Sequence, residues 1–205
     1  MGNNSVANKL IVLMLTFCLA ASAQNDKQAE TILERAASAY QEISCLSIQF
    51  NGSMTGEMIL QGECFYMDYG GVKSWFDGKT QWSYVERNEE VNVSTPSQEE
   101  LNSVHPYAWI SRYKTDFNCK YNGKKTLSGK QVDEVTLIPK QKSELSKITL
   151  CLTADSEPVM ICIAQNGGDE QRLNVTSCEI KRKQDISAFR FDKSKYPNAD
   201  IIDLR

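Results

Sequence analysis

The sequence has few of the residues on which common enzyme and metal chemistry depends. It contains a single histidine, His105, so a His-rich metal site is excluded and a histidine general base would have to be that residue. It has no C-x-x-C pair, no G-x-S-x-G motif and no glycine-rich loop leading into a helix. The 23 basic residues do not outnumber the 26 acidic ones, which gives no electrostatic attraction to nucleic acid. We therefore expect a protein that is not an enzyme and binds no metal, cofactor or nucleic acid; an exported hydrolase that uses His105 is the alternative.

Long hydrophobic runs are missing except near the N-terminus. Polar residues Met1–Lys9 precede an apolar run over Leu10–Ala20, and small residues end at Ala23. The run has 11 residues, whereas a bilayer-spanning helix needs about 20. This pattern predicts a signal peptide over residues 1–23, an exported protein and one mature domain over residues 24–205. Lipidation of Cys18 is disfavoured, because Thr16 and Phe17 stand where a lipoprotein signal has small residues.

Beyond the predicted signal peptide the chain has an even number of cysteines. An even count in an exported protein favours disulfides, and buried free thiols are the alternative. The residues are Cys45, Cys64, Cys119, Cys151, Cys162 and Cys178.

Hydrophobic periodicity changes once along the mature chain. Over residues 28–43 the apolar residues are spaced as on one face of a helix, and they include Ile32, Leu33 and Tyr40. From Cys45 onward they alternate, which predicts half-buried antiparallel strands. The first strands carry Leu46, Ile48, Phe50, Met58 and Leu60.

Further strands follow, separated by turn residues. Asp77-Gly78 between alternating aromatic runs predicts a hairpin, and Asn122-Gly123 is interpreted as another turn. Thr95-Pro96 followed by acidic residues predicts a helix over Pro96–Val104, with a second piece from Pro106 through Trp109 and Ile110. About ten or eleven strands in series are too many for one flat sheet, so the sheet must curl into a complete or incomplete barrel. The remaining strands are predicted over Cys64–Tyr69, Lys73–Phe76, Thr80–Glu86, Val91–Ser94, Phe117–Tyr121, Gln131–Pro139, Lys147–Ala154, Val159–Gln165 and Arg172–Lys183.

One hairpin allows a register to be predicted. If residues 155–158 form a four-residue loop, Cys151 lies directly opposite Cys162, where a disulfide can form. The same register puts six apolar residues together on the other face. They are Ile148, Leu150, Leu152, Val159, Ile161 and Ile163.

Large apolar side chains offer two interpretations. Phe65, Trp75, Trp82, Tyr84 and Trp109 belong to an ordinary filled core, or they line a cavity in a curled sheet that holds an apolar ligand. On the cavity hypothesis the walls also include the apolar residues of the strands around Leu46–Leu60 and Ile148–Ile163.

The order of elements and several motifs resemble the LolA-type periplasmic lipoprotein carriers. Asp77-Gly78-Lys79-Thr80, followed by Trp82 and Tyr84, is similar to the family's D-G-K-T-x-W-x-Y hairpin. The segment Gly56–Leu60 and the C-terminal stretch from Phe189-Arg190-Phe191 to Asp203-Leu204-Arg205 are also similar, and the likeness covers most of residues 28–205.

The resemblance implies an unclosed antiparallel barrel covered by an N-terminal helix and a short helical insertion. It also implies a monomer in the periplasm that carries acylated lipoproteins from an inner-membrane release transporter to an outer-membrane receptor. The lid would be the helix with Ile32, Leu33 and Tyr40 and the insertion with Leu101, Trp109 and Ile110. The family's lid-closing arginine, which precedes a proline, has no counterpart in Leu60-Gln61-Gly62-Glu63. An exported lipid sensor, a carrier of another amphiphile and a disulfide-stapled adhesion module with a filled core are the competing hypotheses.

Overall fold

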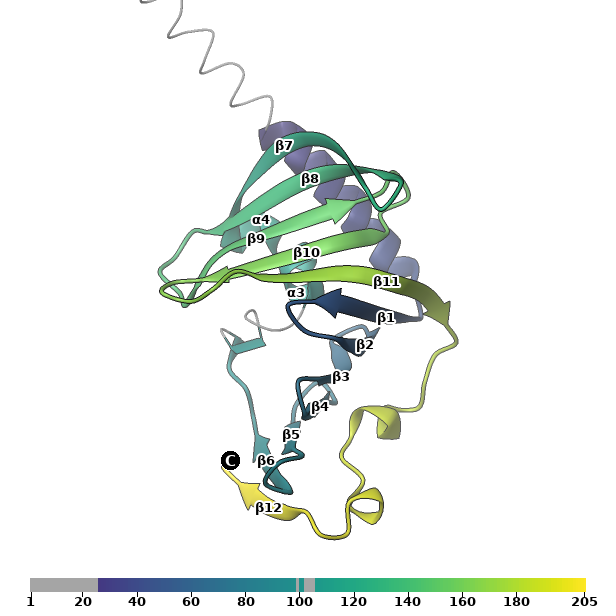
Figure 1. The fold of residues 1–205 in the computed structure, drawn as a ribbon, viewed down its shortest axis with the longest axis vertical. Coiled ribbons are helices and arrows are strands. Elements are labelled where there is room, and N and C mark those ends of the chain that lie inside the picture. Colours follow the sequence, from purple (N-terminus) through teal and green to yellow (C-terminus); the bar gives the residue numbers. More distant parts are fainter. Residues whose placement is uncertain (1–25, 99, 102–105) are drawn as a thin grey trace, which may run out of the picture.

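The fold is one curled sheet that does not close on itself. The structure is a computed structural model and describes residues 26–98, 100–101 and 106–205, so the predicted signal peptide lies outside the described residues. The 12 strands run in the order β12-β6-β5-β4-β3-β2-β1-β11-β10-β9-β8-β7 (Figure 1). Their bounds are Cys45–Gly52 (β1), Gly56–Gln61 (β2), Cys64–Tyr69 (β3), Val72–Phe76 (β4), Gln81–Val85 (β5), Glu90–Ser94 (β6), Phe117–Leu127 (β7), Lys130–Pro139 (β8), Leu145–Leu152 (β9), Pro158–Gln165 (β10), Gln171–Lys181 (β11) and Asp200–Asp203 (β12). The predicted unclosed, mainly β architecture is confirmed.

Two strands differ from the prediction. Strand β7 continues through Asn122-Gly123, which forms a bulge against β8 and is not the predicted turn. Gly123 has φ 102°, a conformation that glycine adopts without a Cβ clash. Strand β12 adds a twelfth strand, and it pairs with β6 in parallel, whereas the other neighbouring strands pair antiparallel.

The helices lie on one face of the sheet. The helix over residues 26–42 crosses β7 to β11, as Figure 1 shows in purple, and α3 (Pro106–Ser111) and α4 (Tyr113–Asp116) lie on the same side. No helix in the described part of the chain is long and apolar enough to span a membrane.

The helical insertion begins later than predicted. Ser97, and not Thr95, caps the helical residues, because its Oγ accepts a hydrogen bond from Glu100 N at 3.3 Å and its N donates to Glu100 Oε2 at 2.6 Å. Such a reciprocal pair is a capping box. Residues 98, 100 and 101 are helical and Pro96 is not, whereas residues 99 and 102–104 of the predicted Pro96–Val104 helix, and His105, lie outside the described residues.

The predicted register of the β9–β10 hairpin is wrong by two residues. Cys162 lies opposite Thr149, and Cys151 lies opposite Met160. The shift arises because the loop spans residues 153–157 and Val159 bulges out of the ladder. Both thiols are free, so the predicted Cys151–Cys162 disulfide is not formed. A shift of two preserves the face, so Ile148 and Leu150 share it with Ile163 and Ile161. The prediction is wrong for Val159, which the bulge places in a cluster on the outer face with Cys151 and Cys162.

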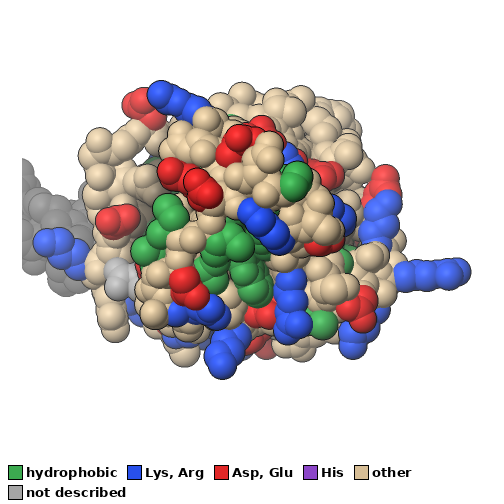
Figure 2. Space-filling model, turned by 90° about the horizontal axis from the view of Figure 1, so that it is seen from below, with side chains coloured by type: hydrophobic (Ala, Val, Ile, Leu, Met, Phe, Trp, Pro, Cys, Tyr) green, Lys and Arg blue, Asp and Glu red, His purple; other side chains and the backbone are tan. Residues whose placement is uncertain are grey.

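The C-terminal segment covers the outer face of the sheet. It contains two 3₁₀ turns, η1 (Ile186–Phe189) and η2 (Lys193–Lys195), before β12. Phe191 and Tyr196 pack on Trp75 with ring centroids 5.6 and 5.8 Å away. Figure 2 views the molecule from the β12 end, where hydrophobic side chains reach the surface among charged ones. Four exposed apolar residues belong to this segment: Ile186, Ile201, Ile202 and Leu204.

Asp77 joins the C-terminal segment to the β4–β5 hairpin. Its Oδ1 accepts hydrogen bonds from Lys79 N at 3.1 Å and Thr80 N at 2.9 Å, and its Oδ2 accepts one from Arg190 Nε at 2.8 Å. Gly78 follows with φ 93°, which completes the turn. Burial alone would raise the pKa of Asp77, but the hydrogen bonds from Thr80, Arg190 and Lys79 outweigh it and lower the pKa below 3.8. The D-G-K-T and F-R-F motifs therefore form one structural unit.

Replacing Asp77 with alanine is expected to lower the free energy of unfolding at pH 7 by about 1.5–3 kcal/mol, because three donors lose a charged acceptor. A carboxyl with a lowered pKa stabilises the fold above its unfolded pKa, and this contribution is lost as the pH falls through the folded value. The difference between wild type and variant should therefore shrink at about pH 2.5. Urea denaturation at both pH values measures the free energy of unfolding of wild type and variant, and hence the difference between them. Asp169→Ala, which removes the charge of an exposed loop residue, should change stability little; an equal loss in both variants would contradict the assignment.

Candidate functional site

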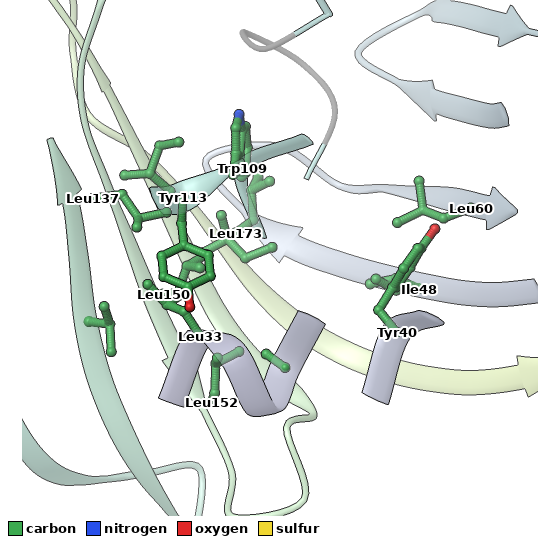
Figure 3. Packing of buried hydrophobic residues seen from close by; sticks show 14 of the residues in the cluster. Leu33, Tyr40, Ile48, Leu60, Trp109, Tyr113, Leu137, Leu150, Leu152 and Leu173 are labelled. Carbon is green, nitrogen blue, oxygen red and sulfur yellow. The ribbon is translucent and has the colours of Figure 1, made fainter. Parts of the chain in front are cut away.

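The inner, concave face of the sheet carries the larger hydrophobic cluster. Cross-strand pairing puts Ile48 opposite Met58 and Leu60 opposite Phe65, so their side chains share this face. The helix over residues 26–42 and α3 supply Leu33 and Trp109, both almost fully buried. Figure 3 shows Leu33, Ile48, Leu60 and Trp109 among the side chains that lie between the helices and the sheet. The predicted cavity residues in this cluster are Leu46, Ile48, Phe50, Met58, Leu60, Phe65, Ile148, Leu150, Leu152 and Ile161, and Ile163 packs against it.

Three predicted cavity residues lie elsewhere. Trp75, Trp82 and Tyr84 belong to a second cluster, on the outer face under the C-terminal segment. The physical reason is that successive side chains along a strand point to opposite faces of the sheet. Phe65 pairs with Phe76, so the adjacent Trp75 must point to the opposite face, where it meets Tyr66 and Trp82. The prediction that these aromatic residues line the cavity is therefore wrong.

The concave face contains a cavity of about 320 Å³, here called the first cavity. It lies between the helix over residues 26–42 and strands β1, β2, β9, β10 and β11. Its lining is mainly apolar, with polar groups at the loop between β9 and β10. The lining residues are Ala36, Ala39, Tyr40, Ile43, Leu46, Ile48, Leu60, Ile110, Leu150, Leu152, Asp155, Ser156, Glu157, Pro158, Ile161, Cys178 and Ile180. Such a cavity argues against the filled-core module.

A second cavity of about 210 Å³ lies beside the first. Helix α3 contributes to both, since Ile110 lines the first cavity and Trp109 lines the second. Ile161 of β10 lines both cavities. The second cavity is lined mainly by Phe50, Met54, Met58, Met67, Tyr69, Trp109, Ile161, Ile163 and Leu173, together with Gln165 and Gln171. The concave face is therefore incompletely filled on both sides of α3.

The predicted lid residues all lie at this interface. Ile32, Leu33, Tyr40 and Trp109 are buried in the inner cluster, and Leu101 and Ile110 pack against it. Polar contacts reinforce the packing, and they include a hydrogen bond from Arg35 Nε to Ser156 Oγ at 3.3 Å and an Arg35–Asp133 ion pair at 3.9 Å. Tyr40 Oη donates to Gly62 O at 3.4 Å, Tyr113 Oη donates to Glu30 O at 3.3 Å, and Lys114 pairs with Glu34 at 3.1 Å.

These contacts show how the helix is held without the family's arginine. Gly62 belongs to the segment that lacks the arginine and proline, yet its carbonyl receives the Tyr40 hydroxyl from the helix. An exposed ion pair such as Lys114–Glu34 contributes about 0–1 kcal/mol. Apolar packing therefore provides most of the attachment, and an apolar ligand between helix and sheet would replace contacts of the same kind.

Sequence reasoning missed the two residues of β11 that line the first cavity, Cys178 and Ile180. The cause is a bulge, because Phe50 pairs with Val175 and Gln49 with Ser177, which leaves Thr176 unpaired. Val175 and Cys178 therefore face the same side despite an odd spacing. Strict alternation would put Cys178 on the outer face, so no local signal identifies it.

An open sheet with apolar cavities beneath a helix defines a class of half-barrel binding proteins. Within this class, the chain belongs to the family described as outer membrane lipoprotein carrier protein LolA, whose model matches residues 18–165. The resemblance seen in the sequence is thereby confirmed. No curated protein matches the chain.

Several solved structures with low sequence identity are similar to this chain, and the first two described here share its fold. An uncharacterised conserved protein from Thermus thermophilus is 12% identical, with a TM-score of 0.60, over 86% of this chain and 99% of that chain. A DUF1329 family protein from Desulfovibrio piger is 8% identical, with a TM-score of 0.50, over 81% and 97%. The Mycobacterium tuberculosis lipoprotein LppX is 12% identical, with a TM-score of 0.45, over 74% and 94%.

Proposed function

We propose that this protein is a non-enzymatic periplasmic carrier that shields the acyl chains of lipoproteins and moves them from the inner to the outer membrane. The observation that carries the proposal is the apolar cavity between the 26–42 helix and the sheet. The family description, outer membrane lipoprotein carrier, supports lipoprotein as the cargo. An inner-membrane release transporter and an outer-membrane receptor are the partners that such a task requires.

The energetics of acyl chains explain why a carrier is needed. Burial of apolar surface is worth about 0.8 kcal/mol per methylene, so a chain of about 15 methylenes represents about 12 kcal/mol. A cargo of this kind does not cross an aqueous compartment unaided. Because the helix is attached mainly by apolar packing, an entering chain can exchange contacts with it at little net cost.

Native mass spectrometry of the protein isolated gently from its own periplasm tests the proposal. We expect bound mass that dissociates as an acylated lipoprotein. Free phospholipid or another amphiphile would instead favour the sensor or the alternative carrier. No ligand across repeated preparations would overturn the carrier function. Retention of cargo by a His105→Ala variant would separate binding from the hydrolase hypothesis.

A further inference from the structure

The first cavity has an entrance with one apolar and one acidic side. The apolar side is formed by Ile43 and by Ile180, which is 68% exposed although its side chain lines the cavity. The opposite side is the β9–β10 loop, with Asp155 and Glu157. An exposed isoleucine that continues into an apolar cavity is where an acyl chain would enter, so a headgroup would remain beside this loop.

The charges around the loop do not cancel. Arg35 pairs with Asp133 at 3.9 Å and donates from Nε to Ser156 Oγ of the loop at 3.3 Å, and Lys130 pairs with Glu157 at 3.3 Å. Asp155 forms no ion pair with any of the described residues and its side chain is exposed. Glu179 and Lys181 flank Ile180 and pair with each other. Glu42 precedes Ile43, Arg182 follows Lys181, and these two residues have opposite charges. The surplus charge at the entrance is therefore the carboxylate of Asp155.

The charge of the loop extends into the cavity. Cys178 lines the cavity, and its pKa is raised, first by burial and then by the charge of Glu157, while Lys130 lowers it by less. The Glu157 carboxylate therefore lies close enough to the cavity to act on a group inside it. An anionic headgroup at the entrance would also face the carboxylate of Asp155.

We propose that this entrance selects acyl ligands whose headgroup has no negative charge, such as glycerides, over fatty acids and anionic phospholipids. The inference rests on the proposed function and deepens it by specifying the cargo. The acyl chain of either ligand gains the same burial, so the headgroup decides between them. At a solvated site, repulsion between two carboxylates a few ångströms apart corresponds to about a five- to tenfold loss of affinity.

Displacement of the uncharged dye N-phenyl-1-naphthylamine from the mature protein tests the inference at pH 8. Laurate and monolaurin have the same acyl chain, and only laurate is an anion. We expect monolaurin to displace the dye at about five- to tenfold lower concentration than laurate. In Asp155→Asn, the laurate concentration needed to displace the dye should fall several-fold, and the monolaurin concentration should stay unchanged. Glu89→Gln removes one charge from the exposed β5–β6 turn and is the matched control, for which no change is expected.

The outcomes separate this inference from the proposed function. If laurate displaces the dye as well as monolaurin does, or if Asp155→Asn leaves laurate unchanged, headgroup selection is overturned while acyl binding stands. An equal gain for laurate in Glu89→Gln would also overturn it, because net charge and not the entrance would then be responsible. If neither lipid displaces the dye, the proposed acyl-binding function itself fails.

Discussion

Replacing Ala39 with tryptophan is expected to reduce binding of an uncharged apolar dye or a lauryl ligand by about tenfold or more. Ala39 lies on the 26–42 helix, is half-buried and lines the first cavity. An indole at this position would occupy the space that an acyl chain needs, while adding apolar contact between helix and sheet. Fluorescence titration measures the loss, and urea denaturation should show that the fold is retained.

Ser38→Trp is the matched control for this prediction. Ser38 is the preceding residue on the same helix and its side chain is exposed, so an indole there does not reach the cavity. Binding should remain at the wild-type level. Undiminished binding in Ala39→Trp, with the fold intact, would show that ligands bind elsewhere. Ala39→Phe should lose less binding affinity than Ala39→Trp, because a phenylalanine side chain is smaller than that of tryptophan and fills less of the cavity.

The Trp109→Ala variant is expected to lower the free energy of unfolding by about 3–5 kcal/mol. Trp109 is only 1% exposed and is one of the largest fully buried side chains on the concave face. It also lines the second cavity, so its removal enlarges a space that is already present. Urea denaturation followed by circular dichroism measures the loss without depending on tryptophan fluorescence.

Trp82→Ala provides the comparison, since Trp82 is half-buried at the outer face of the sheet. Its removal should destabilise the protein less and should leave dye binding unchanged. If the two variants lost the same stability and binding, the division of the aromatic residues between inner and outer clusters would be wrong.

The alternation of apolar and polar residues was sufficient to predict the inner face of a strand where the two residue types alternate strictly. Leu46, Ile48 and Phe50 alternate with polar residues, and all three lie in the inner cluster as predicted. Alternation fails where two large residues are adjacent, as at Trp75 and Phe76, because either one can be chosen for the inner face. The pairing of Phe76 with Phe65 resolves the choice, and that pairing is visible only in three dimensions.

Irregular backbone accounts for most of the remaining differences. The bulge at Thr176 inserts one residue, which reverses the face of the residues that follow on β11, and the bulge at Val159 shifts the register of β10 against β9. They hid Cys178 from the predicted cavity and displaced the expected partner of Cys151. Strand β12 was missed for another reason: it is short, its side chains are exposed, and its parallel partner β6 lies more than a hundred residues earlier in the chain.

The six cysteines of the described chain have a consequence for redox behaviour. All six are free, and burial raises the pKa of every one, to about 11 for Cys119 and about 12 for Cys151. Because the thiolate is the reactive form, a raised pKa slows the reaction of each thiol with oxidants and alkylating reagents at neutral pH. Cys45, Cys151 and Cys162 are also buried, so the rate at which each of them reacts with a maleimide measures how often its part of the sheet opens. Cys151 would report on the outer face of β9.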